Sequence, residues 1–210
     1  MEKIIRTVYT PCEREKIIEK SRFITYCAHT ETEEQARAFV AEIRSKHTLA
    51  THVCYAFVAD KLGNLQRFSD DGEPQGTAGV PILEVLKNKK LFETAVAVVR
   101  YFGGVKLGAG GLVRAYSSSA AECLDGADIR ILQTCAEYEI SVDYTGIDGV
   151  QKYISTHTCS LLSTDYTDVV RFLVAVKTSE EHTFVQGLVD YMQGRVQVKR
   201  GKEYFAPFKE

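Results

Sequence analysis

Apolar and polar residues alternate with a period of two over residues 16 to 28 and 51 to 60, which predicts two strands that each bury one face. Between them, apolar residues recur at helical spacing behind a pair with the spacing of a capping box. The helix is predicted from Ala36, Phe39, Val40 and Ile43, and its start from Thr30 and Glu33.

Residues 94 to 102 are apolar on both faces, as expected for a central strand that is covered from two sides. A helix is predicted before this strand, over residues 77 to 87. The small residues from 110 to 123 predict a second helix that packs closely on the same strand.

After Ile131 the pattern predicts strand, helix, strand, strand, helix and strand, which is the ferredoxin-like order. The second of these helices is expected to begin with a capping box formed by Thr178 and Glu181. The sequence therefore predicts an α+β protein with a domain over residues 1 to 133 and a ferredoxin-like domain over 134 to 210. The six expected elements cover residues 136 to 143, 146 to 157, 159 to 164, 168 to 176, 180 to 192 and 195 to 205.

The composition is that of an ordinary globular protein, with 45% apolar and 26% charged residues. The 26 basic residues against 28 acidic ones exclude a chain that coats nucleic acid through bulk charge, so any such binding must be local. No apolar run approaches the roughly 20 residues of a membrane-spanning helix, and the charged amino end is unlike a secretory signal. We expect a cytoplasmic protein that does not contact membranes. The six cysteines lie apart without a C-x-x-C pair and are expected to be reduced residues of the core.

Eight of the 15 glycines lie between Gly72 and Gly111, in two blocks. The second block, R-Y-F-G-G-V-K-L-G-A-G-G-L-V-R-A-Y, leads from a strand through a loop into a helix. Exposed amides at a helix start, together with nearby cations, suit an anion. Close packing of the helix on the sheet explains the glycines equally well. The candidate anion-binding residues are Arg100, Gly103, Gly104, Lys106, Gly108, Gly110, Gly111 and Arg114.

The first block, S-D-D-G-E-P-Q-G-T-A-G-V-P, begins at Ser69. Its carboxylates, Asp70, Asp71 and Glu73, are of the ligand type that Mg²⁺ prefers, although such residues also serve simply to make turns. Nearby side chains and amides are candidates to receive a phosphate or the backbone of a partner. These candidates are Arg67, Gln75, Gly76 and Thr77.

No catalytic residue is predicted, because His52 stands alone on a strand and no serine or cysteine has the neighbours of a nucleophile. The last strand is basic. Its cations could contact phosphates or could protect an edge strand from pairing with other chains. They are Arg195, Lys199, Arg200 and Lys202.

The two glycine-rich strings closely resemble the signature of the Impact family, in its bacterial, YigZ-type branch. The resemblance covers residues from about 16 to 125 and from about 136 to 195. It implies an N-terminal domain similar to the second domain of ribosomal protein S-five and a C-terminal domain similar to domain five of translocation factors. It also implies an association with translation or RNA, although a shared fold alone does not establish a function.

Two functions follow as hypotheses. The first is a non-enzymatic binding protein for RNA, the ribosome or translation factors, with a role in translation regulation and no cofactor. The alternative is an enzyme that uses Mg²⁺ and binds a nucleotide or another small phosphorylated substrate. Both hypotheses expect the two blocks to form one polar site in which Arg67, Asp71, Gln75, Lys106 and Arg114 converge. The competing expectation is that an aspartate of the first block only pairs with an arginine of the second.

Overall fold

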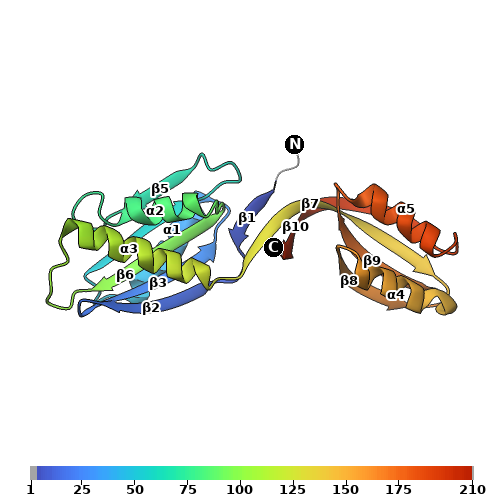
Figure 1. The fold of residues 1–210 in the computed structure, drawn as a ribbon, viewed down its shortest axis with the longest axis horizontal. Coiled ribbons are helices and arrows are strands. Elements are labelled where there is room, and N and C mark those ends of the chain that lie inside the picture. The colour runs from blue at the N-terminus through green and yellow to red at the C-terminus, as the bar shows by residue number, and fades with distance from the viewer. Residues whose placement is uncertain (1–3, 210) are drawn as a thin grey trace. The chain divides into compact units, whose positions relative to one another are not determined.

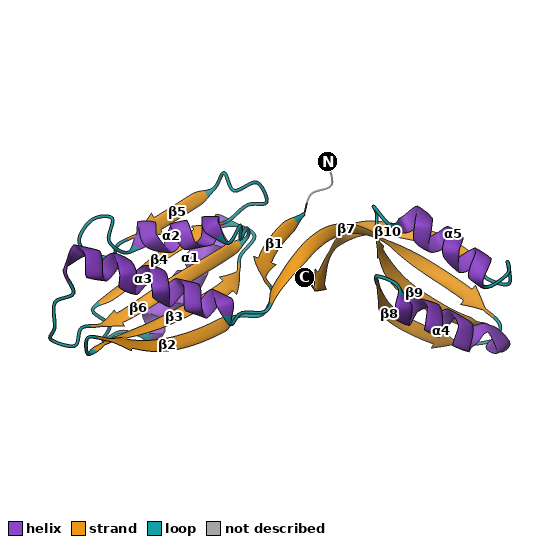
Figure 2. Cartoon of the chain, viewed as in Figure 1, coloured by secondary structure: helices purple, strands orange, loops and turns teal. Residues whose placement is uncertain are grey.

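The computed structural model describes residues 4–209 and divides into two compact units, which cover Ile5–Ile131 and Leu132–Phe208. The first unit is built on a five-stranded sheet with the order β2-β3-β6-β4-β5. Helix α1 (Glu33–Lys46) covers one face, and α2 (Gly79–Asn88) and α3 (Gly108–Asp125) cover the other (Figures 1 and 2). The strands are β2 (Cys12–Ile18), β3 (Ser21–His29), β4 (His52–Val58), β5 (Gln66–Ser69) and β6 (Thr94–Tyr101).

Strand β6 lies at the centre of this sheet, between β3 and β4, and pairs antiparallel with both. Its side chains alternate between the two faces. Val96 and Val98 join the core under α2 and α3, whereas Ala97 and Val99 join the core under α1. The prediction of a central strand buried on both sides is confirmed.

Two local predictions in this unit were wrong, and one strand was missed. The expected strand over residues 16 to 28 is a hairpin, because the chain turns at Glu19 and Lys20, which both have positive φ. The cap of α1 is Thr32 rather than Thr30, since the Thr32 hydroxyl accepts the Gln35 amide at 3.3 Å. Strand β5 was not predicted.

The second unit has the order β7 (Ile129–Val142), α4 (Ile147–Thr156), β8 (Cys159–Tyr166), β9 (Val170–Lys177), α5 (Glu181–Tyr191) and β10 (Gln197–Lys209), with a 3₁₀ turn, Tyr144–Gly146, before α4. Strand β7 begins inside the first unit. It pairs with β9 and β10, and the first unit also contains the short strand β1 (Ile5–Val8). The βαββαβ order confirms the ferredoxin-like prediction.

The expected capping box of α5 was wrong, because both residues bind elsewhere. The Thr178 hydroxyl donates to the Thr134 carbonyl at 3.1 Å, and the Glu181 carboxylate accepts from Tyr138 and Arg200. All six cysteines are free, as predicted. Within residues 4–209, every helix is too short or too polar to cross a bilayer.

The glycine that opens the loop after β6 is required by a close approach of two backbones. A Cβ atom at Gly103 would lie 1.9 Å from the carbonyl oxygen of Lys20, in the β2–β3 turn. We expect Gly103→Ala to lower the free energy of unfolding by about 1–3 kcal/mol, because the hairpin must move. Urea denaturation measures this change.

Gly110 provides the matched control. It lies in α3, and the nearest atom to an added Cβ is Arg114 Nη1 at 3.7 Å. Gly110→Ala should leave stability unchanged or raise it by up to about 1 kcal/mol through helix propensity. Equal losses in the two variants would contradict the role assigned to Gly103.

Candidate functional site

The first glycine-rich segment folds around Asp70. Its carboxylate accepts hydrogen bonds from the amides of Gly76 at 2.8 Å, Ala78 at 3.0 Å and Gly79 at 2.8 Å. The amides of Ala78 and Gly79 belong to the start of α2, whose cap residue Ala78 offers no side-chain acceptor, and Gly76 lies in the turn just before it. Burial alone would raise the pKa of Asp70, but the three amides lower it below its ordinary value. Asp70 therefore serves as the cap of α2.

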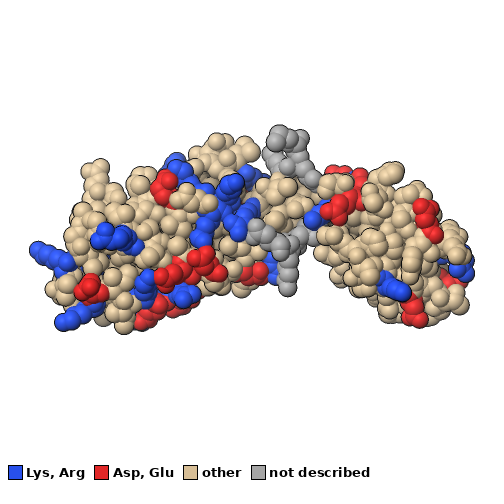
Figure 3. Space-filling model, viewed as in Figure 1, with Lys and Arg blue, Asp and Glu red and all other residues tan. Residues whose placement is uncertain are grey.

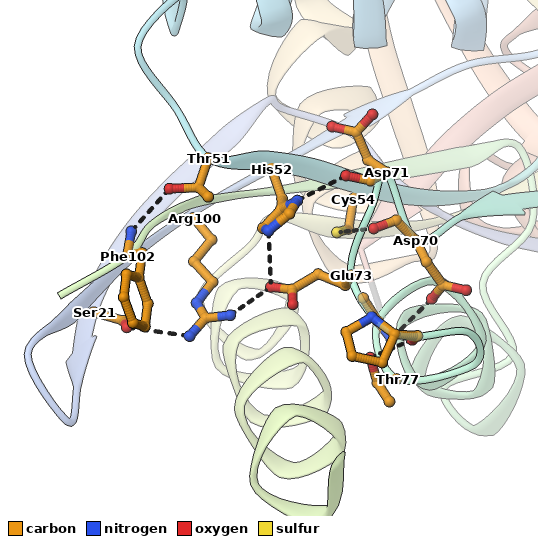
Figure 4. A network of polar contacts seen from close by, with 12 residues as sticks. Ser21, Thr51, His52, Cys54, Asp70, Asp71, Glu73, Thr77, Arg100 and Phe102 are labelled. Atoms are coloured by element: carbon orange, nitrogen blue, oxygen red, sulfur yellow. Dashed lines mark hydrogen bonds and ion pairs between the residues drawn. The ribbon is translucent and has the colours of Figure 1, made fainter. Parts of the chain in front are cut away.

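Asp71 ties the segment to the sheet and to α1. Its carboxylate accepts from the Val53 amide at 2.6 Å and from Arg44 at 2.6 Å. Its carbonyl oxygen lies 2.7 Å from Nδ1 of His52 (Figure 4). The residue has a φ of +45°, a left-handed conformation that suits aspartate in a turn.

Glu73 joins the first segment to the second. Its Oε1 accepts from Nη1 of Arg100 at 2.6 Å and from the Tyr116 hydroxyl at 2.8 Å. Only 4% of the Glu73 side chain and 6% of the Arg100 side chain are exposed. Burial raises the pKa of Tyr116, which keeps its hydroxyl protonated as a donor. The two segments thus meet through a buried ion pair.

Arg100 is held from several sides. Its Nη2 lies 3.3 Å from the Ser21 hydroxyl, and its guanidinium carbon lies 5.5 Å from the ring centres of Phe23 and Phe102 (Figure 4). The positive charge of Arg100 is therefore compensated inside the protein, by Glu73 and by the faces of two aromatic rings. The structure does not place it where a bound anion could reach it.

The groups around the pair do not form an activated nucleophile. The Cys54 thiol donates to the Asp70 carbonyl at 3.0 Å, and burial raises the pKa of this cysteine to about 12. It is therefore a thiol at neutral pH. His52 Nε2 lies 3.9 Å from Glu73 Oε1, beyond hydrogen-bond distance.

The three acidic residues proposed as magnesium ligands face different partners. Asp70 binds the start of α2, Asp71 binds Arg44 and Val53, and Glu73 binds Arg100. Within residues 4–209, they are not among the groups whose donor atoms come within 4.8 Å of one another. The structure does not bring these carboxylates together around one point.

Two predicted cations do share a surface. Lys106 and Arg114 line a groove of about 580 Å³ beside the start of α3, together with Lys16, Glu19 and Gly111. Leu107, at the cap position of α3, supplies no side-chain acceptor, and the first turn carries no acidic residue. Lys106 and Arg114 are exposed and form no ion pair with any residue from 4 to 209, whereas Lys16 pairs with Glu122.

The start of α3 is shaped by glycine. Gly104 and Gly108 have φ of +87° and +68°, and Gly110 is exposed. Backbone amides at this helix end are therefore accessible between two unpaired cations. In Figure 3, basic and acidic side chains are intermixed on the face of the first unit that is shown. The positive charge of the groove therefore comes from its own residues and is not part of a larger basic surface on the face that is shown.

The other predicted binding residues lie outside this groove. Arg67 is near Glu33, with Nε to Oε1 at 3.6 Å, and the Thr77 hydroxyl donates to the Pro74 carbonyl at 2.6 Å. Gln75 is exposed, and Gly76 makes a turn with φ of +76°. The two segments converge, but through Glu73 and Arg100 rather than through the five expected side chains.

Two of the basic residues of the last strand have acidic partners. Arg200 pairs with Glu181 at 3.1 Å and with Glu203, and Lys202 lies 3.5 Å from Glu137. Arg195 and Lys199 are exposed. Two of the four cations predicted as a second binding surface, Arg200 and Lys202, therefore already have acidic partners within the second unit.

Sequence reasoning missed Arg44, Ser21 and Tyr116. Tyr116 lies two residues past Arg114, a predicted binding residue in the same string, so its place in the motif was the available signal. Arg44 and Ser21 carry no such signal, because only the fold brings them to Asp71 and Arg100.

Comparison with known proteins places these features in a family. The model of the Impact N-terminal domain matches residues 19–124, and a domain of unknown function, DUF1949, matches residues 140–195. The chain belongs to the Impact family. It is 38% identical over 196 residues to the IMPACT family member YvyE of Bacillus subtilis, covering 93% of this chain and 90% of that protein.

A further relative and a solved structure are similar to this chain over most of its length. The IMPACT family member YigZ of Escherichia coli is 37% identical, with 86% of this chain and 90% of that protein covered. A crystal structure described only as that of a hypothetical protein is 35% identical and superimposes with a TM-score of 0.62, covering 94% of this chain and 97% of that one. The glycine-rich segments of this Impact-family chain both lie inside the matched N-terminal domain.

The buried pair should be costly to break from one side. Glu73→Gln leaves Arg100 buried without its counter-charge, so we expect the free energy of unfolding to fall by about 3–5 kcal/mol. Urea denaturation at pH 7 measures the loss. The exposed Glu84→Gln should change stability by less than about 0.5 kcal/mol. A Glu73→Gln variant as stable as wild type would refute the pair's structural role.

The cap at Asp70 predicts a pH dependence. The pKa of folded Asp70 lies below its ordinary value of 3.8, so its stabilisation is present at neutral pH and is lost as pH falls through the folded pKa. Asp70→Asn should cost about 1 kcal/mol at pH 7, and the difference from wild type should shrink below about pH 4. Urea denaturation across this range tests it, with the exposed Asp125→Asn as control. A difference that stays constant with pH would contradict the assignment.

Proposed function

We propose that this Impact-family protein is a non-enzymatic binding protein that holds the phosphate backbone of RNA, on the ribosome or in another structured RNA. The proposed contact is the groove at the start of α3. One observation carries the proposal: an uncapped helix end lies between Lys106 and Arg114, two exposed cations that form no ion pair with any residue from 4 to 209, although Glu19 also lines the groove.

The chemistry of this groove favours phosphate. Accessible amides at a helix start donate to an anion, and the partial positive charge of the helix end adds to that of the two side chains. Because the chain as a whole has a net charge of −2, affinity must come from this local arrangement.

A polymer fits this surface better than a small substrate does. Small-molecule sites bury most of their ligand and place polar groups at the base of a cleft. Here both cations are exposed and the groove is lined by α3, its preceding loop and the β2 hairpin. The residues that an enzyme would need for magnesium bind other parts of the chain, and we therefore propose that RNA binding needs no resident metal.

Salt-dependent titration tests the proposal. The wild-type chain should bind ribosomes or structured RNA with an affinity that falls steeply with salt. Lys106→Ala with Arg114→Ala should weaken binding at least tenfold at low salt. It should also reduce the slope of log affinity against log salt by about 1.4–1.8, because each of the two phosphate contacts contributes about 0.7–0.9. Filter binding at several salt concentrations gives both values.

The matched control removes the same charge elsewhere. Lys46→Ala with Lys152→Ala replaces two exposed lysines that lie outside the groove and should keep the wild-type slope. If the two double variants weaken binding equally, the effect comes from net charge and not from the groove, which would contradict the proposal. Undetectable binding by wild type at low salt would also refute it. A nucleotide with Mg²⁺ that raises the melting temperature by several degrees, an effect lost in Asp71→Asn, would replace it with the enzyme hypothesis.

A further inference from the structure

A second cluster of polar side chains lies at the opposite end of β6 from Arg100. Its members are His29, the last residue of β3, Glu31, which follows it, and Glu93, which directly precedes β6. The strand register places His29 opposite Thr94 and therefore next to Glu93. One donor atom from each of the three side chains lies within 4.8 Å of the other two.

Glu93 is the unusual member. The residue is only 2% exposed, and its Oε2 has no hydrogen-bond partner among residues 4–209. Leaving a carboxylate buried and incompletely paired is costly, which implies that a cationic partner would be bound favourably.

The backbone holds Glu93 in place. Its φ is +47°, a backbone conformation that residues other than glycine rarely adopt. Its carbonyl accepts from the Thr30 amide at 2.8 Å and lies 3.1 Å from the Thr7 hydroxyl. Strained residues held by surrounding hydrogen bonds are common at ligand sites.

His29 is oriented by a second residue. Its Nδ1 lies 2.8 Å from the Thr7 hydroxyl oxygen, and its Nε2 lies 3.3 Å from Glu31 Oε1. When Nδ1–H donates to Thr7, the lone pair of Nε2 is directed toward the carboxylate side of the cluster. An imidazole fixed in this way through its other nitrogen is the usual arrangement of a metal-binding histidine.

We propose that His29, Glu31 and Glu93 bind one divalent cation of the Mn²⁺ or Zn²⁺ class. One imidazole and two carboxylates are suitable ligands for such ions, and the two negative charges match the charge of the cation. His29 and Glu31 also line a hollow of about 820 Å³ between α1 and the β2–β3 edge, from which water could complete the coordination. The site is distinct from the three acidic residues of the glycine-rich segment.

The probe must avoid a nearby group of thiols. The sulfur atoms of Cys12, Cys27 and Cys123 also lie within 4.8 Å of one another, and thiolates prefer softer ions such as Zn²⁺. Mn²⁺ prefers oxygen and imidazole ligands, so it distinguishes the proposed site from the thiol group. Electron paramagnetic resonance of free Mn²⁺ measures its binding to the full chain after treatment with a chelator.

We expect wild type to bind one equivalent of Mn²⁺, and His29→Gln and Glu31→Gln to bind it at least tenfold more weakly. Glu31 is 59% exposed at its side chain, so its substitution leaves the core intact if His29→Gln does not fold. Glu34→Gln, at an exposed carboxylate outside the cluster, should bind as wild type does. Absence of saturable binding by wild type at millimolar Mn²⁺, or wild-type affinity in a folded Glu31→Gln or His29→Gln, would overturn the proposal.

Discussion

The first unit depends on one buried ion pair, Glu73 with Arg100, which joins a loop to the central strand. Two charges away from water are unfavourable unless each finds well-placed partners. Here Tyr116 and Ser21 supply further hydrogen bonds, and two aromatic rings border the guanidinium group. Because these partners come from β3, α3 and two loops, the pair defines how the elements at this end of the sheet meet.

The glycines around the pair follow from the same constraint. Gly103 passes against the β2–β3 turn, and a Cβ at Gly79 would lie 2.9 Å from the backbone of Ser69. Side chains at these positions would separate the segments that the pair holds together. Much of the glycine-rich signature therefore serves close packing. The exposed amides at the start of α3, between Lys106 and Arg114, are the part that packing does not explain.

The two ends of β6 use their charges differently. At the Arg100 end, buried charges neutralise each other inside the protein, and the cations that are left over face the groove. At the Thr94 end, Glu93 is buried with an oxygen that lacks a hydrogen-bond partner among the described residues. Arg100 Nε also lacks a hydrogen-bond partner among residues 4–209, but the charge of Arg100 is balanced by Glu73, whereas Glu93 lies within 4.8 Å of a second carboxylate, Glu31. This contrast is the physical basis of both proposals.

The sequence by itself determined the elements whose signal is local. The apolar run of β6, the helical spacing in α1 and the order of the second unit are all readable, because burial of each face imposes its own period. The family was readable as well, from two strings of unusual composition. The cation pair of the groove, Lys106 and Arg114, could be named because helix α3 and its loop are continuous in the chain.

The tertiary structure decided which polar residues form hydrogen bonds and ion pairs with one another. Thr30 and Thr32 are equally good caps in sequence, and the period of two passes through the turn at Glu19 without a break. Asp71 binds Arg44, and His29 meets Glu93, across 27 and 64 residues of chain. Hydrogen bonds and ion pairs depend on distances of a few ångströms between segments that the sequence leaves unplaced. Only the fold brings them together.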